Sequence, residues 1–230
     1  MRRFWLFFAV TLVSTFAGCD ADYNRRLASA TDNIKFVARI NKNLTEAPTS
    51  PGFDQIPLFV RPPRPMALAQ EFQLAAVNVP GQFDLAATFL DPQDDKLHVL
   101  ARFKKARRTA KNAPPPQPRG PFKAEIMGIL GGVYGVTGGK FNPDKQSPNT
   151  FERMDIKLQN DRFAQVYLYN RGDLDVALIW DYPNSQKAAL ASKIVLCLKS
   201  FAVGPRAKSS FSGNLLQDEA APGTGGAVSF

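Results

Sequence analysis

Residues 164–182 read AQVYLYNRGDLDVALIWDY, and this stretch decides the fold class of the chain. Its first half alternates small or aliphatic residues with polar or aromatic ones, which is the two-residue period of a β-strand. Its second half, from Leu174 to Tyr182, is apolar on both faces, as expected of a strand at the centre of a sheet. The four residues between the halves, NRGD, are typical of a tight turn. The stretch therefore predicts two neighbouring antiparallel strands.

Similar strand patterns precede this pair in the sequence. Residues 83–89 and 97–101 alternate in the same way around the polar turn 91–95, which predicts a β-hairpin. Residues 154–158 also alternate, and they predict the first strand of a meander that continues through residues 164–182. The sequence therefore predicts an antiparallel sheet of about five strands.

Two helices are predicted to pack on this sheet. Residues 122–133 have apolar residues at spacings of three and four, although three glycines weaken this helix and suggest close packing on a neighbour. A second helix is predicted over about 183–203, with one apolar face and a Gly-Pro pair that stops it. The chain is therefore predicted to contain an α+β domain over residues 83–204.

The order of these elements is a hairpin, a helix, a three-strand meander and a long C-terminal helix. This order is similar to the PsbP-like α/β/α sandwich, over about residues 80–204 and including a last helix that ends in Lys199-Ser200-Phe201. The resemblance implies a binding or assembly factor, because proteins of that fold are mostly of this kind. A fold alone does not establish a function.

Two segments precede the predicted domain. Residues 19–46 predict a heptad-like helix, in which apolar residues recur every three or four positions and Asn41 lies in the same stripe. We expect this helix to be a stalk or to dock on its own domain, and self-association through residues 24–44 is the alternative. Residues 47–82 are rich in proline and predict an extended, semi-rigid spacer. This spacer could lie along the domain or dock in an aromatic groove of a partner.

Two further segments lack a periodic pattern. Residues 104–121 form a basic, Pro-rich loop inside the predicted domain. Residues 205–230 are small, polar and rich in glycine, and they predict a disordered tail.

The first 19 residues have the pattern of an export signal. Arg2 and Arg3 precede an uncharged, mostly apolar run over residues 4–18, and Cys19 follows. A run of about 15 residues is short for a membrane span, which needs about 20, whereas a charged start and a small-residue end fit a signal peptide. The segment resembles bacterial lipoprotein signals, with residues 16–19 (Phe-Ala-Gly-Cys) as the lipobox, although that family usually has leucine at the first of these positions.

This resemblance implies that residues 1–18 are a signal peptide that is removed and that Cys19 carries fatty-acyl groups such as palmitate. Each buried methylene contributes about 0.8 kcal/mol, so two or three acyl chains anchor a protein firmly. The resemblance predicts an exported protein that is anchored to a bacterial membrane and faces the periplasm or the cell exterior. In some bacteria an aspartate directly after the lipidated cysteine favours retention in the inner membrane, and Asp20 stands at that position. The alternatives are a plain signal peptide cut near Gly18 and an uncleaved anchor.

The two cysteines of the chain support this interpretation. If Cys19 is lipidated, Cys197 has no partner and no internal disulfide can form. Cys197 lies in an apolar helical pattern, which favours a buried core residue. A catalytic thiol would need a histidine, and His98 is the single histidine of the chain.

No motif in the chain specifies a reaction, a metal or a cofactor. One histidine and one internal cysteine cannot form a zinc site of the usual spacing, and no Gly-x-Ser-x-Gly motif accompanies His98. Residues 128–140 are rich in glycine but lack the spacing of a P-loop, and the turn 91–95 lacks the glycine and glutamate of a calcium-binding loop. Three aspartates of the last strands carry no sign of general acid catalysis: Asp173, Asp175 and Asp181.

Charge is the remaining feature of the sequence that bears on function. Without Arg2 and Arg3, 29 basic residues become 27 against 20 acidic residues, a formal balance of about +7. A flexible basic loop can bind anionic lipid headgroups at about 1 kcal/mol per charge. It could equally bind an acidic envelope partner or be a solvated loop, and export argues against nucleic acid. The cations lie between positions 102 and 123 with no acidic residue among them: Arg102, Lys104, Lys105, Arg107, Arg108, Lys111, Arg119 and Lys123.

The sequence therefore predicts a membrane-anchored envelope lipoprotein that is a non-enzymatic binding or assembly factor, with no cofactor and no metal. The alternative is an envelope enzyme or an enzyme inhibitor. A deep pocket with converging polar groups would favour that alternative.

Overall fold

A computed structural model of the chain describes most of its residues: 2–48, 53, 55–74, 82–105, 119–147 and 150–211. Side chains are described from residue 23 onward within these ranges, apart from residues 208, 209 and 211. The chain divides into two compact units, residues 1–42 and residues 43–230.

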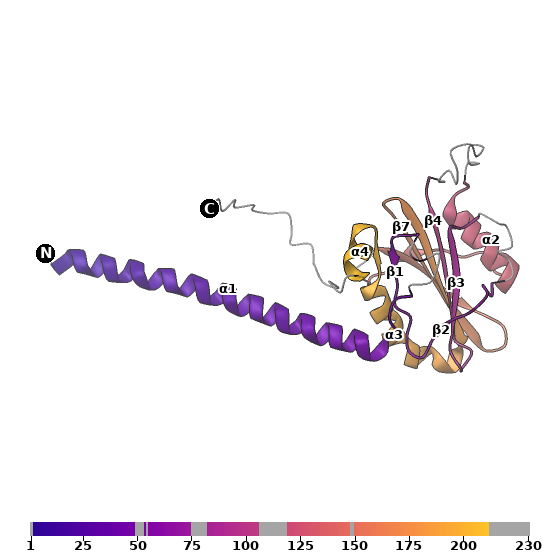
Figure 1. The fold of residues 1–230 in the computed structure, drawn as a ribbon, viewed down its shortest axis with the longest axis horizontal. Coiled ribbons are helices and arrows are strands. Elements are labelled where there is room, and N and C mark those ends of the chain that lie inside the picture. The colour runs from indigo at the N-terminus through magenta and orange to yellow at the C-terminus, as the bar shows by residue number, and fades with distance from the viewer. Residues whose placement is uncertain are drawn as a thin grey trace. The chain divides into compact units, whose positions relative to one another are not determined.

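The first unit is one long helix, α1 (Arg2–Asn43), drawn in indigo and purple in Figure 1. The stretch from Cys19 to Asn43 contains neither glycine nor proline, so no residue in it interrupts a helix. The helix predicted over residues 19–46 is part of α1 as far as Asn43, whereas residues 44–46 are not helical, and its role as a stalk stays a prediction. Within the described part of the chain, no helix combines the length and the apolar run needed to cross a membrane.

The second unit is an α+β domain built on a seven-stranded sheet whose neighbouring strands are all antiparallel. A smaller two-stranded sheet pairs β1 (Leu58–Phe59) with β9 (Ala202–Val203). The strands of the large sheet, in spatial order, are β2 (Ala67–Leu68), β3 (Leu85–Leu90), β4 (Lys96–Phe103), β8 (Leu174–Pro183), β7 (Arg162–Arg171), β6 (Phe151–Lys157) and β5 (Asn142–Pro143).

The strands predicted from the alternating patterns are confirmed. Residues 164–182 form most of β7 and all but the end of β8, and β8 lies at the centre of the sheet between β4 and β7. Every residue from Leu174 to Tyr182 is buried, as the apolar pattern on both faces predicts. The sheet has seven strands and not about five, because β2 and β5 extend its edges with two residues each. Strands this short carry no periodic signal.

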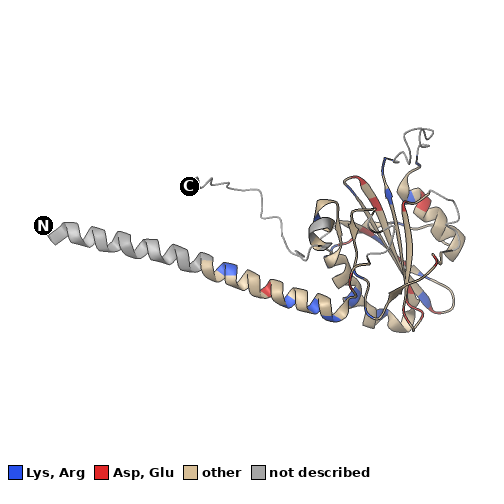
Figure 2. Cartoon of the chain, viewed as in Figure 1, with Lys and Arg blue, Asp and Glu red and all other residues tan. Residues whose placement is uncertain are grey.

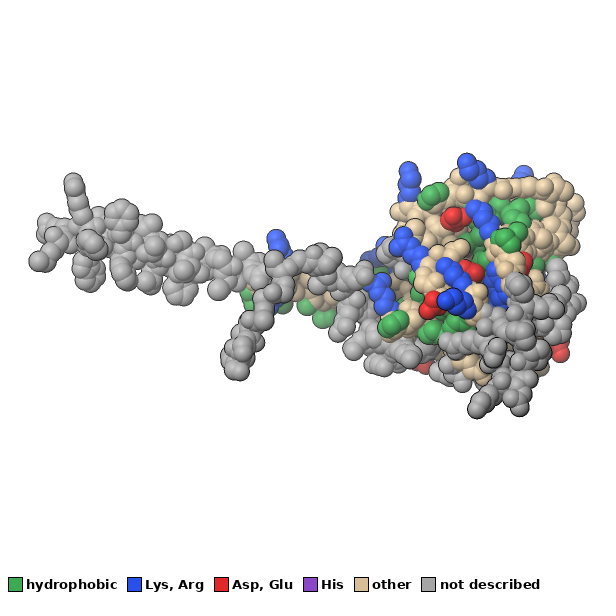
Figure 3. Space-filling model, turned by 90° about the horizontal axis from the view of Figure 1, so that it is seen from above, with side chains coloured by type: hydrophobic (Ala, Val, Ile, Leu, Met, Phe, Trp, Pro, Cys, Tyr) green, Lys and Arg blue, Asp and Glu red, His purple; other side chains and the backbone are tan. Residues whose placement is uncertain are grey.

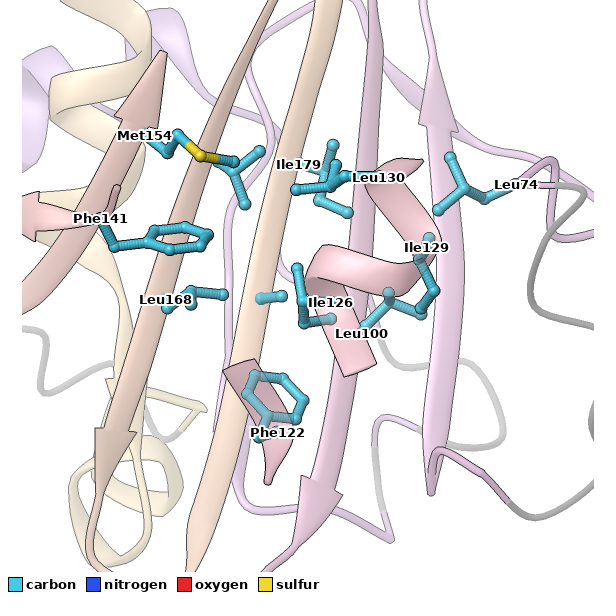
Figure 4. Packing of buried hydrophobic residues seen from close by; sticks show 12 residues of the cluster. Leu74, Leu100, Phe122, Ile126, Ile129, Leu130, Phe141, Met154, Leu168 and Ile179 are labelled. Atoms are coloured by element: carbon cyan, nitrogen blue, oxygen red, sulfur yellow. The ribbon is translucent and has the colours of Figure 1, made fainter. Parts of the chain in front are cut away.

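Helix α2 (Phe122–Tyr134) packs on one face of the sheet, as predicted. Figure 4 shows its apolar side chains lying over Leu100 of β4 and Ile179 of β8. The α2 glycines are only partly in close contact, because a Cβ at Gly128 would meet open space while one at Gly131 would lie 3.3 Å from the Val136 carbonyl oxygen. The buried cluster on this face comprises Leu74, Leu100, Phe122, Ile126, Ile129, Leu130, Phe141, Met154, Val166, Leu168, Ala177 and Ile179.

Helix α3 (Lys187–Ser200) covers the opposite face, after the short 3-10 helix η1 (Asn184–Gln186). Side chains in a strand alternate between the two faces, so the neighbours of Ala177 and Ile179 in β8 point away from α2. Figure 1 shows α2 and α3 on opposite sides of the sheet. The Phe201 ring, directly after α3, lies 5.0 Å from the Phe151 ring of β6.

The Pro-rich segment predicted to be a spacer is packed on the domain over its described residues 55–74. Ile56, Leu58 and Val60 are buried, β1 pairs with β9, and β2 pairs with β3. The Arg64 backbone N–H also donates to the Asn43 carbonyl oxygen at 2.9 Å. This segment is therefore part of the folded unit and is not extended away from it. Its strands are two residues long, too short for a sequence pattern.

The C-terminal end of the domain differs from its prediction in two places. Helix α3 ends at Ser200 and not near Val203, because residues 202–203 are extended and pair with β1. Gly204, with φ 65°, then leads into α4 (Pro205–Phe211), whose proline stands at the first helical position, where its missing N–H costs nothing. The predicted disorder is therefore wrong for residues 205–211, and residues 212–230 lie outside the described residues.

Candidate functional site

One end of the large sheet carries the basic segment predicted from the sequence. Lys104 follows β4, and its backbone N–H donates to the Asp173 carbonyl oxygen at 2.9 Å, in the turn between β7 and β8. Arg171, the last residue of β7, precedes this turn, and it lines a small cavity of about 180 Å³ together with Lys123 at the start of α2. We call this end of the sheet the basic end, and its described cations are Lys104, Lys105, Arg119, Lys123 and Arg171.

Arg119 holds the end of the basic loop on the sheet. Its Nη1 and Nη2 atoms donate to the two carboxylate oxygens of Asp84 at 2.7 and 3.0 Å, and Nη1 also donates to the Phe103 carbonyl oxygen at 2.7 Å. The hydrogen bonds to Asp84 raise the pKa of Arg119 above its usual value. Because Arg119 binds the Phe103 carbonyl oxygen and Lys104 directly follows Phe103, Lys104 and Arg119 lie near each other on the sheet.

Arg102 is an interior residue, with a side chain only 3% exposed. Its Nη1 donates to Glu125 Oε2 at 2.7 Å, its Nη2 donates to the Gly120 carbonyl oxygen at 2.7 Å, and its Nε lies 3.4 Å from Asp175 Oδ2. The guanidinium also lies 5.0 Å from the centre of the Phe122 ring. Arg102 therefore fixes the start of α2 to β4 and β8 and does not present its charge to the surface.

Lys123 forms a surface ion pair with Glu152, with 2.7 Å between the ammonium nitrogen and a carboxylate oxygen. Both side chains are about half exposed. Exposed pairs of this kind contribute about 0–1 kcal/mol to stability, so an incoming anion can compete with Glu152 for the ammonium group.

Lys104, Lys105 and Arg171 are the open cations of the basic end. All three are exposed, and none of them forms an ion pair with a residue that the structure describes. Figure 3, a view onto this end, shows Lys and Arg side chains spread over the surface with fewer Asp and Glu side chains between them. Three predicted cations lie outside the described residues: Arg107, Arg108 and Lys111.

Sequence reasoning missed two features of this end. The partners of Arg102 come from residues 23 and 73 positions away, although an arginine between Ala101 and Phe103 in an apolar strand already indicates a buried ion pair. Arg171 lies outside the basic segment and joins it only because the turn after β7 lies beside the end of β4.

His98 and Cys197 do not form a catalytic pair. The His98 ring is buried in β4, its Nδ1 lies 2.9 Å from the Thr88 hydroxyl, and burial lowers its pKa to about 4. Cys197 is fully buried in α3, and burial raises the pKa of its thiol to about 12. A thiol of that kind carries almost no thiolate near neutral pH.

The acidic turn 91–95 folds back on itself. Asp91 Oδ1 accepts hydrogen bonds from the backbone N–H groups of Gln93 at 2.7 Å and Asp95 at 3.0 Å. Among the residues that the structure describes, no group of three or more His, Cys, Asp or Glu side chains could hold a metal ion. Of the three aspartates that the sequence analysis considered as acids, Asp175 and Asp181 are buried and form ion pairs with arginines. The third, Asp173, is exposed.

An open concavity of about 620 Å³ lies along the outer edge of β6. Lysine side chains at 140, 145 and 157 line it, and its Arg153 and Asp155 pair with each other at 2.7 Å. Among the described residues that line this concavity, none is a histidine, cysteine or serine.

Cys19 lies within α1, in the stretch whose side chains the structure does not describe.

No family model and no curated protein matches the chain. Among solved structures, the chain is similar to the solution structure of cyanobacterial PsbP (CyanoP) from Synechocystis sp. PCC 6803, with a TM-score of 0.44 and 10% identity. The similarity covers 70% of this chain and 93% of that one.

Proposed function

We propose that the protein is a non-enzymatic envelope lipoprotein, anchored through acyl groups on Cys19, whose domain binds an anionic surface through its basic end. The signal-like residues 1–18 and the lipobox support the anchor. The three open cations of the basic end support the binding surface. An envelope enzyme gains no support from the buried His98 and Cys197.

The observation that carries this proposal is the arrangement of the basic loop. Its two ends are held on the sheet by the Arg119–Asp84 pair and by the Lys104 backbone, while Lys104, Lys105 and Arg171 keep their charges open to solvent. A cation that already has a carboxylate partner gains little from a second anion, whereas an open cation gains the full interaction. The arrangement thus supports contact of several cations with one flat anionic surface.

An anionic bilayer fits this arrangement better than an isolated anion. Each cation near such a surface contributes about 1 kcal/mol, so only several together give useful affinity. An acyl anchor would hold the domain close to the bilayer, which raises the effective concentration of headgroups and makes weak contacts sufficient. An acidic envelope partner is the alternative.

The test uses residues 19–230 with Cys19→Ser, which has no acyl group, in flotation assays with vesicles. Vesicles with a third of phosphatidylglycerol are expected to bind it, and neutral phosphatidylcholine vesicles are not. The triple variant Lys104→Gln, Lys105→Gln, Arg171→Gln should bind the anionic vesicles roughly 100-fold more weakly, from about 1 kcal/mol per charge.

The matched control is Lys140→Gln, Lys145→Gln, Lys157→Gln, which removes the same charge from the concavity at the edge of β6. It should bind within about threefold of the unchanged chain, because charges outside the contact act only through the net charge. Equal binding to neutral and anionic vesicles, or equal losses in the two triple variants, would reject the bilayer as the surface. Crosslinking in the native membrane would then be used to identify an acidic partner.

A further inference from the structure

The described part of α1 carries an exposed apolar stripe. Tyr23 is 63% exposed, Leu27 is 53% exposed and Ile34 is 70% exposed. Large apolar side chains are rarely this exposed in a row, and a contiguous row marks a surface that contacts another molecule.

The stripe follows a heptad repeat without a break. With Leu27 and Ile34 at a positions, the next a position is Asn41, and the d positions between them hold small or apolar residues. The repeat covers the 19 residues from Tyr23 to Asn41, whose 18 steps of 1.5 Å make about 27 Å of helix. The seam consists of Tyr23, Leu27, Ala30, Ile34, Val37 and Asn41.

The charges of α1 are arranged around this seam. In the same register, the b and f positions, which lie away from the seam, hold five of the six charged residues between 23 and 42. Arg26 is the sixth and lies at a g position, and the e position that faces it in a parallel pair holds the uncharged Thr31. Figure 2 shows these cations along the described part of the helix. The outer charges are Arg25, Asp32, Lys35, Arg39 and Lys42.

The composition of α1 supplies a second reason for a partner. Residues 28–33 read ASATDN, and Ser, Thr, Asp and Asn are all weak helix formers. Most of the stability of a helix in a protein comes from packing of an apolar face, and in α1 Ile40 is already fully buried while Leu27 and Ile34 are exposed.

We infer that α1 pairs with α1 of a second copy as a parallel, in-register coiled coil through the seam from Tyr23 to Asn41. A second copy presents the same uncharged seam, and its outer charges stay in water, so the two helices meet without like-charge repulsion. An asparagine at an a position favours a parallel, two-stranded arrangement in register, because it then meets its own counterpart. This pairing does not depend on acylation, and a parallel pair would bring both Cys19 residues to the same end.

The test measures the mass of residues 19–230 with Cys19→Ser by sedimentation equilibrium over a range of concentrations. This chain is expected to form a dimer. Leu27→Asp with Ile34→Asp should weaken the dimer by roughly 100-fold or more, because unpaired carboxylates would be buried in the seam. Ala28→Asp with Ser29→Asp adds the same charge away from the seam and should leave the dimer unchanged. A monomer at every concentration, or a dimer that survives in the seam variant, would overturn the inference.

The orientation is tested by oxidation of single-cysteine variants on the same background, since Cys197 is fully buried. Ile34→Cys should form a disulfide-linked dimer, because equal a positions meet in a parallel pair, and Ala28→Cys should not. Crosslinking at 28 and not at 34 would exclude this seam. Vesicle binding by the basic end is measured separately and is expected to persist in the monomeric seam variant, so the two proposals can fail independently.

Discussion

Arg102 and Asp175 face each other across the β4–β8 pair, with the arginine Nε 3.4 Å from the carboxylate Oδ2, in the interior of the domain. Glu125 of α2 completes this group at 2.7 Å from Arg102 Nη1. Among the described cations of the basic segment, the most buried one therefore connects the sheet to the helix.

Replacing Arg102 with methionine should lower the free energy of unfolding by about 3–5 kcal/mol, because Asp175 would be left buried without its cation. The double variant Arg102→Met, Asp175→Leu should recover part of this loss, because the buried carboxylate is then gone and the carboxylate left without the arginine, Glu125, is 22% exposed and reaches water. Urea denaturation monitored by the fluorescence of Trp180 measures the free energy of unfolding of the single and the double variant. Lys104→Met serves as the control, and a loss of equal size in that variant would contradict the structural role of Arg102.

Asp95 should make the domain less stable as pH rises from about 4 to about 7. Its side chain is only 2% exposed, and burial together with the neighbouring Asp91 raises the pKa of Asp95 from 3.8 to about 7. In this window the folded state holds a proton that the unfolded state has released, so stability falls with rising pH. Asp95→Asn should remove this fall, measured as urea midpoints at pH 4.5, 6 and 8. Parallel pH profiles of the urea midpoint for Asp95→Asn and the unchanged protein would contradict the raised pKa of Asp95.

His98 should stay neutral down to pH about 4. Burial, with a smaller contribution from Lys96, lowers its pKa to that value. Because the unfolded chain takes up this proton near pH 6.5, His98 should cost stability as pH falls from about 6.5 to about 4, opposite in sign to Asp95. His98 is the single histidine, so its ring proton resonances need no further assignment. A titration midpoint near 6.5 in the folded protein would show that the ring is not buried.

Cys19→Ser should abolish the incorporation of radiolabelled palmitate into the protein expressed in a bacterium. The cysteine sulfur is the acylation point implied by the resemblance to lipoprotein signals, and serine offers no thiol. Cys197→Ser is the control and should label normally, because Cys197 is fully buried. Label that persists in Cys19→Ser would reject the lipid anchor.

The central part of the fold could be predicted from the sequence because its signals are local. The alternation in β7, the continuous apolar run in β8 and the helical spacing in α2 identify those elements without reference to the rest of the chain. The strands β1, β2, β5 and β9 have two residues each and cannot show a period. They form because a neighbouring strand supplies hydrogen-bond partners, and this also explains why the Pro-rich segment packs on the domain.

By itself, the sequence determined which residues alternate, which turns separate them, and that the cations between 102 and 123 lie on one stretch of chain. Only the tertiary structure decided what each charge does. Arg102 is buried between Asp175 and Glu125, Arg119 is bound to Asp84, and Lys104 and Lys105 stay open. The physical reason is that an ion pair needs its partners within about 4 Å, and residues 35 and 73 positions apart come that close only when the strands pair.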